Sequence, residues 1–89
     1  MTCITKRATA GTLESSDAFV ELTPYDGGVM LEIESVVFRQ FGQDIRETAE
    51  SVLRAFDVRN ARVFIQDSGA LDCVLRARLE TAIRRGGEA

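Results

Sequence analysis

Two neighbouring hydroxyls, those of Ser15 and Ser16, lie between the carboxylates of Glu14 and Asp17. A serine hydroxyl is a weak nucleophile unless a base removes its proton, and the chain contains no histidine. The segment begins at Gly11 and consists mostly of small and polar residues, which favours an accessible turn. These hydroxyls are therefore better suited to receive a covalent group from a separate enzyme than to catalyse a reaction themselves.

The other polar residues do not form a pattern typical of a catalytic or metal site. Cys3 and Cys73 make neither a Cys-x-x-Cys pair nor the spacing of zinc ligands. Glu32 and Glu34 alternate along an expected strand, which is the usual pattern of a solvated sheet face. We therefore expect no catalytic residues and no metal ligands. Cys73 is interpreted as a small buried side chain near the apolar stripe of a helix.

The overall composition predicts one globular domain over residues 1–89. Of the 89 residues, 45% are hydrophobic and 28% are charged, which is ordinary for a folded domain and unlike a disordered chain. Residues 8–38 contain six acidic side chains and no Lys or Arg, so nucleic acid is not an expected partner. Apolar runs are too short for a signal peptide or a membrane span. With only two cysteines, we expect a cytoplasmic protein that has no membrane partner.

Alternation of apolar and polar residues predicts strands in the first half of the chain. Residues 18–23 and 29–34 alternate in this way, and residues 24–28 between them have turn chemistry. This pattern predicts an antiparallel hairpin. Residues 8–15 could add a third strand or an exposed arm, in which Gly11 permits an irregular backbone.

The second half of the chain has a helical period, interrupted by a short strand over residues 61–66. The first predicted helix carries an apolar stripe of Val37, Phe41, Ile45, Thr48, Ala49, Val52, Leu53 and Phe56. The second carries a stripe of Leu71, Val74, Leu75, Leu79, Ala82 and Ile83. For the second helix, residues 67–69 offer N-cap candidates, Asp72 is favourable negative charge near the helix start, and Gly86 is a plausible C-cap.

The predicted order is strand, strand, strand, helix, strand, helix. This order indicates an α+β two-layer sandwich, in which a small mixed sheet of about four strands has both helices packed on one face. The solvated side of the second helix would carry a cluster of arginines, namely Arg76, Arg78, Arg84 and Arg85. Such a run is usually a solvated face, and its alternative role is to dock an acidic partner.

Three segments form a distinctive combination: AGTLESSD at residues 10–17, QFG at 40–42, and DSGALDCVLRARLE at 67–80. Together they resemble the acyl carrier (gamma) subunit of citrate lyase, a bacterial protein of citrate fermentation. The resemblance covers nearly the whole chain, in order and at matching length.

The resemblance implies a covalently attached CoA-derived arm, which would make the chain a phosphoprotein. In that family 2'-(5''-phosphoribosyl)-3'-dephospho-CoA is joined through a phosphodiester to the serine of a Gly-Thr-x-Glu-Ser segment, which here is Ser15. The flanking recognition segment would comprise Gly11, Thr12, Glu14, Ser16 and Asp17. Ser16 departs from the family's pattern, because many relatives carry glycine there.

By the same resemblance, the chain is a non-catalytic subunit that carries acetyl and citryl thioesters during cleavage of citrate to acetate and oxaloacetate. The implied partners are the alpha and beta subunits of citrate lyase, with a prosthetic-group transferase and an acetylating ligase binding transiently. In that scheme the alpha subunit exchanges acetyl for citrate and the beta subunit cleaves the citryl thioester.

Two alternative functions and one alternative site stay open on the sequence. The chain could be the carrier of a related enzyme, such as citramalate lyase, or a plain interaction module that docks a partner through the arginine cluster with Ser15 unmodified. Ser68 is the alternative attachment site, because Asp67-Ser68 superficially resembles the Asp-Ser of ordinary acyl carrier proteins. We interpret Ser68 as a helix-capping residue instead.

Overall fold

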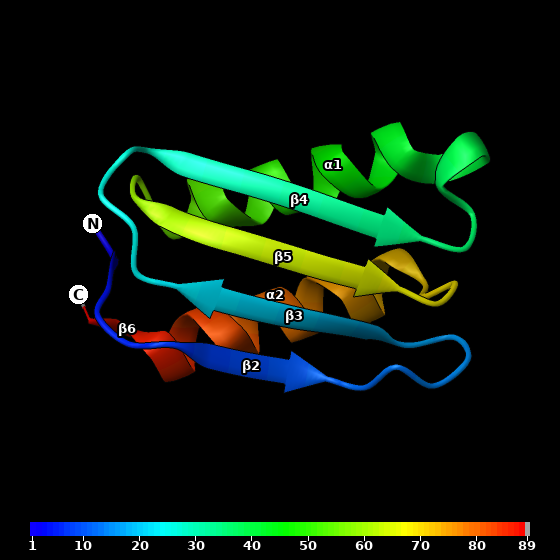
Figure 1. Ribbon diagram of the computed structural model, residues 1–89, viewed down its shortest axis with the longest axis horizontal. Helices are drawn as coiled ribbons and strands as arrows, with labels where there is room; N and C mark the ends of the chain where they lie inside the picture. The colour runs from blue at the N-terminus through cyan, green and yellow to red at the C-terminus, as the bar shows by residue number, and fades with distance from the viewer. Residues whose placement is uncertain (89) are drawn as a thin grey trace.

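The computed structural model describes residues 1–88 and shows a sheet with two helices packed on one face (Figure 1). The elements in chain order are β1 (Cys3–Ile4), β2 (Ala8–Gly11), β3 (Ala18–Thr23), β4 (Val29–Ser35), α1 (Phe38–Ala55), β5 (Ala61–Asp67), α2 (Asp72–Gly86) and β6 (Gly87–Glu88). The main sheet has four strands and mixed directions, so the predicted α+β class is confirmed. A small antiparallel pair, β1 with β6, joins the two ends of the chain and was not predicted.

The predicted hairpin between β3 and β4 is wrong. The strand order is β2-β3-β5-β4, so β5 lies between these two strands, antiparallel to β3 and parallel to β4. Burial explains this arrangement, since Ala61, Val63 and Ile65 of β5 are fully buried whereas Val29 of β4 is 43% exposed. Strand β5, with these fully buried side chains, takes a central position, and the connection over residues 24–28 passes the end of β5.

The core fills the layer between the sheet and the helices. Its largest fully buried side chains are Leu22, Ile65, Leu79, Ile83, Val20 and Val63, which come from β3, β5 and α2. Each contributes about 1.5 to 3 kcal/mol by leaving water. Helix α1 adds Ile45, Ala49, Val52 and Leu53 to the same cluster. These positions follow the predicted apolar stripes.

Two members of those stripes are exposed, contrary to prediction. Phe41 is 49% exposed near the start of α1, and Leu71 is 69% exposed immediately before α2. Cys73 is also exposed, because it lies at the second position of α2 on the side away from the buried stripe. The predicted helical periodicity is correct, but each apolar stripe extends beyond the part that the sheet covers.

The predicted caps of the second helix are corrected as well. Helix α2 begins at Asp72, so Asp67 and Ser68 lie too early in the chain to cap it, and Leu71 occupies the N-cap without a side-chain hydrogen bond. Asp72 does place an acidic group in the first turn. Gly86 is the last helical residue rather than a left-handed C-cap. A Cβ there would lie 2.9 Å from the Ala8 side chain, so close packing explains this glycine.

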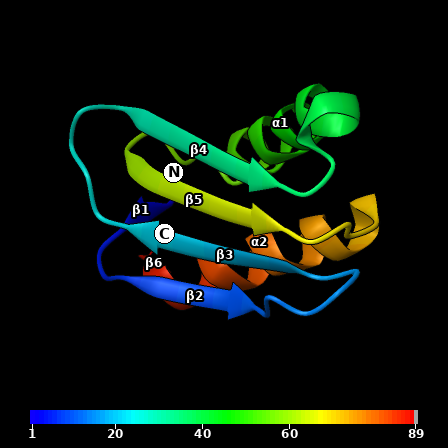
Figure 2. The same ribbon diagram turned by 45° about the vertical axis from the view of Figure 1, so that its right-hand side comes forward.

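Three connections gather at one end of the sheet. The β2–β3 loop, the β4–α1 turn and the β5–α2 segment all lie at the right-hand end in Figure 1, and the rotated view in Figure 2 agrees. Both helices begin at this end. The turn that contains Ser15 therefore lies beside the entrance to α2.

Candidate functional site

Ser15 and Ser16 occupy the two central positions of a tight turn. The Asp17 backbone N–H donates to the Glu14 carbonyl at 3.1 Å and closes the turn, and both serines are exposed. Ser16 has a φ of 66°, in the left-handed region that favours glycine. This backbone geometry gives a physical reason for the glycine expected at that position in relatives.

Asp17 anchors the turn to helix α2. Its carboxylate accepts hydrogen bonds from Arg78 Nε at 3.0 Å and Arg78 Nη2 at 2.9 Å, from Thr12 Oγ1 at 2.7 Å and from the Ala18 N–H at 2.7 Å. These bonds, that of Arg78 foremost, hold the pKa of Asp17 far below its usual range. The carboxylate is therefore ionised near neutral pH, and its paired geometry with Arg78 fixes one end of the turn.

Gly11 leaves the space that this arrangement needs. Its φ is 89°, and a Cβ built there would lie 1.8 Å from the Ala18 carbonyl oxygen and 3.1 Å from Arg78 Cδ. Any larger residue would push β3 away and obstruct the arginine on its way to Asp17. The glycine is required both by its backbone conformation and by the close approach.

The turn is also tied to the segment after β5. The Ser16 N–H donates to the Ser68 carbonyl at 2.8 Å, and the Ser68 N–H donates to the Asp17 carbonyl at 2.9 Å. The Ser68 hydroxyl donates to the Leu13 carbonyl at 3.3 Å. Ser68 thus braces the Ser15 turn and does not cap α2.

The flanking residues named from the sequence therefore differ in whether they are anchored or exposed. Gly11 and Asp17 contact the scaffold, whereas the side chain of the exposed Thr12 makes its hydrogen bonds within the loop, to Asp17 and from the Glu14 N–H at 3.2 Å. Glu14 and Ser15 are exposed. Within residues 1–88, no side chain hydrogen-bonds to the Ser15 hydroxyl, and this hydroxyl is available from solvent.

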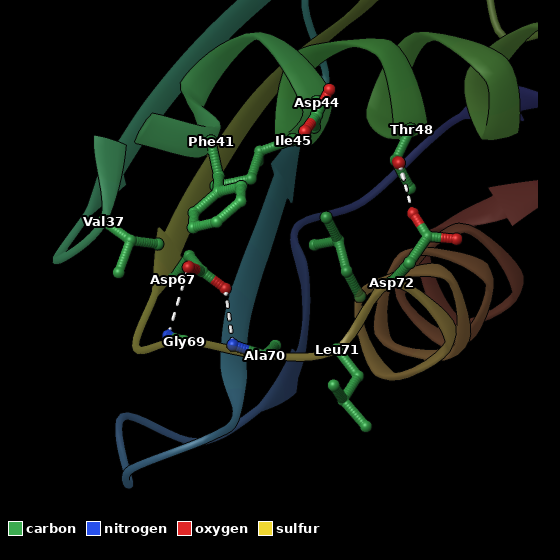
Figure 3. A pocket seen from close by; sticks show the side chains of 11 residues that line it. Val37, Phe41, Asp44, Ile45, Thr48, Asp67, Gly69, Ala70, Leu71 and Asp72 are labelled. Atoms are coloured by element: carbon green, nitrogen blue, oxygen red, sulfur yellow. Dashed lines mark hydrogen bonds between the residues drawn. The ribbon is translucent and has the colours of Figure 1, made fainter. Parts of the chain in front are cut away.

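A cavity of about 380 Å³ lies on the other side of the β5–α2 segment, between this segment and α1 (Figure 3). Asp67 shapes its wall by accepting hydrogen bonds from the Gly69 N–H at 3.1 Å, the Ala70 N–H at 3.0 Å and the Ser35 hydroxyl at 2.8 Å. Sequence reasoning missed this cavity. The sequence features that could have indicated the cavity are two apolar residues, Phe41 and Leu71, which were predicted to lie in the core.

The arginine cluster makes contacts within the chain. Arg76 pairs with Asp72 at 2.8 Å, the Arg84 guanidinium lies 5.5 Å from the centre of the Phe56 ring, and Arg85 donates to the Thr9 carbonyl at 2.8 Å. Since Arg78 pairs with Asp17, each of the four arginines has an internal partner. This arrangement does not favour a free basic patch.

Two further observations on the described residues concern metal ions and membranes. Among residues 1–88, no three His, Cys, Asp or Glu side chains are grouped so that they could hold a metal ion. None of the described helices is both long and apolar enough to cross a membrane.

Comparison with known proteins gives a consistent result. A family model described as the malonate decarboxylase delta subunit, with the short name ACP, matches residues 5–86. The citrate lyase acyl carrier protein of Treponema denticola is 45% identical over 85 residues, which cover 96% of this chain and 97% of that protein. The chain belongs to the citrate lyase acyl carrier protein family. The resemblance inferred from the sequence is confirmed.

Other members of this acyl carrier family show the same extent of similarity. The citrate lyase acyl carrier protein of Cronobacter sakazakii is 49% identical over 97% of this chain and 89% of its own length. The Haemophilus ducreyi protein of the same name is 51% identical over 92% of this chain and 85% of its own length. The predicted function, an acyl carrier of the citrate lyase type, is therefore confirmed at the level of the family.

A solved structure supports the fold. In the crystal structure of a Pseudomonas malonate decarboxylase hetero-tetramer with malonate, one chain superposes with a TM-score of 0.73. The match covers 96% of this chain and 93% of that one, at 22% sequence identity. The acyl carrier family member described here thus shares its fold with a component of that assembly.

Proposed function

We propose that this acyl carrier is a non-catalytic subunit of a cytoplasmic citrate lyase and that its prosthetic arm is attached to the Ser15 hydroxyl. One observation supports this turn as the site: Ser15 is exposed at its tip, while Gly11 packs closely against Ala18 and Asp17 is bound to Arg78 of α2. The site is accessible to a large enzyme, yet its backbone is held in one geometry.

The residues around Ser15 fit a phosphodiester-linked group. The hydroxyl makes no internal hydrogen bond within residues 1–88, so its modification breaks no contact. Arg78 balances the charge of Asp17, which leaves Glu14 as the unbalanced carboxylate of the turn. When bound, phosphoribosyl-dephospho-CoA would supply a long flexible arm that ends in a thiol. This chain's own residues supply the attachment point and hold it outward.

The scaffold is suited to carry an acyl group between two active sites. Tethering replaces a bimolecular encounter with an intramolecular one, at an effective concentration of roughly millimolar for a short flexible linker. The proposed partners are the alpha and beta subunits of the lyase, a transferase that attaches the arm, and a ligase that acetylates it. The carrier unit is proposed to comprise residues 1–89 as a single domain.

Intact-mass measurement tests the proposal. The chain is produced together with the enzymes that build and transfer the arm, alongside the variants Ser15→Ala, Ser16→Ala and Ser68→Ala. We expect the mass increment of phosphoribosyl-dephospho-CoA on the parent chain and on the second and third variants, and its complete loss in Ser15→Ala. An increment that persists in Ser15→Ala, or a parent chain that stays unmodified, would contradict the proposal.

A further inference from the structure

The cavity beside the Ser15 turn has an incomplete apolar wall. Both helices contribute to this wall, through Val37, Phe41, Ile45, Leu71 and Leu75 (Figure 3). Phe41 is 49% exposed and Leu71 69% exposed, although covering such side chains is favourable because it removes apolar surface from water. A volume of about 380 Å³ falls within the range of small-molecule sites. The wall would gain stability from an apolar or amphipathic ligand of modest size.

The polar groups of the cavity are acidic. Asp44, Asp67 and Asp72 line it together with the apolar wall, and no Lys or Arg is among the described residues that line it. Hydrogen bonds from Thr48 and Arg76 lower the pKa of Asp72, so that it is ionised near neutral pH. Arg76 pairs with Asp72, so the unbalanced negative charge of the cavity comes from Asp44 and Asp67, which have no ion pair within residues 1–88. These carboxylates would repel an anionic ligand, whereas a neutral ligand with N–H or O–H groups could donate to Asp44.

The cavity lies within reach of Ser15. The Ser68 carbonyl accepts the Ser16 N–H at 2.8 Å, and Ala70, two residues further along, lines the cavity. Two residues span at most about 7 Å of extended chain. A long arm attached to Ser15 therefore need only pass over the segment between Ser68 and Ala70 to bring its far end into the cavity.

We propose that this cavity binds the pantetheine end of the arm when its acyl group is neutral, and rejects it when the acyl group carries carboxylates. The proposal rests on the attachment at Ser15 proposed above. Pantetheine is neutral and has amide N–H and hydroxyl donors that suit Asp44, while the arm's phosphates stay outside the acidic rim. A neutral acetyl group would thus rest on its own carrier, and a citryl group would remain free for a partner subunit.

A weak site is sufficient for this behaviour. Because the arm is tethered, its effective concentration at the cavity is on the order of millimolar. A dissociation constant in the same range for the free ligand would leave the tethered group bound for about half of the time. The group would still leave readily when a catalytic subunit offers a better site.

The first test uses free probes and the full-length, unmodified chain. S-acetylpantetheine and S-succinylpantetheine are titrated separately, and the methyl resonances of Ile45 and Leu75 are followed by NMR. We expect saturable shifts with the acetyl probe and at least roughly threefold weaker binding of the succinyl probe, because of its carboxylate. Absent shifts at both methyls, or equal binding of the two probes, would overturn the proposal.

Matched variants sharpen this titration. Phe41→Ala removes part of the apolar wall and should weaken acetyl-probe binding roughly fivefold. Met30→Ala, which alters an exposed apolar residue near the start of β4, away from the β4–α1 turn, should leave it unchanged. Asp44→Asn should reduce the preference for acetyl over succinyl, whereas Glu50→Gln on the same helix should not. If the Phe41→Ala and Met30→Ala variants bind the acetyl probe equally well, the cavity is not the binding site.

The second test uses the chain with the arm attached, verified by intact mass. Acetylation of the arm should shift the Ile45 and Leu75 methyl resonances without any added probe, and succinylation should shift them much less. A chain that acquires no mass at Ser15 contradicts the proposed attachment site. A correctly loaded chain whose cavity methyls do not respond to acetylation overturns the cavity assignment and leaves the attachment site intact.

Discussion

The two loops that flank β3 have similar turn-forming compositions but are held in different ways. The loop over residues 24–28 is fixed mainly by two hydrogen bonds near its end, from the Gly28 N–H to Asn60 Oδ1 and from the Ala61 N–H to the Gly28 carbonyl. The loop over residues 12–17 is fixed by an ion pair to α2, by an internal side-chain hydrogen bond and by contacts to Ser68.

The difference indicates which of the two loops has to keep one defined geometry. A connection that only joins two strands needs little beyond a permissive backbone. The Ser15 loop instead recruits Arg78, a residue 61 positions from Asp17, and is preceded by Gly11, where no Cβ fits. Long-range anchoring, rather than turn composition, distinguishes the proposed attachment site.

The comparison is tested most strongly by the two positive-φ glycines of these loops. Gly11→Ala should lower the free energy of unfolding by about 3 kcal/mol, because its Cβ would meet the Ala18 carbonyl oxygen. Gly28→Ala should cost only about 1 kcal/mol, because the structure leaves open space there and only the backbone conformation is penalised. Urea unfolding measures both values. Equal losses would show that the close approach at Gly11 is unimportant.

A second way to sharpen the comparison is to remove the anchor of one loop. Arg78→Gln should slow attachment of the arm to Ser15 roughly tenfold under single-turnover conditions, because the acceptor is no longer held in place. Arg59→Gln, which breaks an exposed ion pair with Asp57 at the other end of the molecule, is the matched control and should leave the rate unchanged. Similar rates for the two variants would refute a positioning role for Arg78.

The pH dependence of stability should also differ between the loops. The pKa of Asp17 is lowered in the folded chain, while in the unfolded chain it takes the ordinary value of about 4. Its stabilising contribution is therefore complete above about pH 4 and is lost as the pH falls toward the lowered folded-state value. Urea unfolding at several pH values should show that Asp17→Asn destabilises the chain above about pH 4 and progressively less below it.

The control for that experiment is Asp26→Asn, an exposed position in the loop over residues 24–28. It should alter stability little at any pH, since the structure shows no ion pair for Asp26 within residues 1–88. If the loss caused by Asp17→Asn is the same at low and neutral pH, the ion pair with Arg78 is not its origin.

The smallest effect is expected at the turn itself. Ser16→Gly should raise the free energy of unfolding by about 0.5 to 1 kcal/mol, because a serine there adopts a left-handed backbone that glycine adopts without strain. Ser15→Gly serves as the control and should not stabilise the chain, since Ser15 is not among the residues with positive φ. Thermal unfolding followed by circular dichroism distinguishes the two.

The sequence predicted the individual strands and helices well, but it predicted less well which strands lie next to each other in the sheet. Alternation placed the strands around Val20, Leu31 and Val63 correctly, and helical spacing found both helices. The hairpin was wrong because a turn signal between two strands does not say whether a third strand will lie between them. That choice depends on how the apolar faces of all the strands are buried together against the helices, which local alternation does not show.

The site was predicted only in part, for a related reason. The residues singled out the Ser15–Ser16 segment, and the family resemblance implied Ser15 within it, but the role of Arg78 could not be predicted, because the pairing with Asp17 joins distant parts of the chain. Likewise, periodicity alone cannot separate a core residue from one at the rim, so Phe41 and Leu71 were assigned to the core and the cavity was missed.

Peptide mapping of the loaded chain tests the central claim most directly. Because no Lys or Arg occurs within residues 8–38, trypsin releases Ser15 and Ser16 together in the peptide of residues 8–39, and Ser68 in the peptide of residues 63–76. Fragmentation that preserves the modification then distinguishes the two adjacent serines. The predicted result is the full mass increment on the first peptide, located at Ser15. An increment on the second peptide, or at Ser16, would contradict the claim that the anchored turn presents Ser15 as the attachment site.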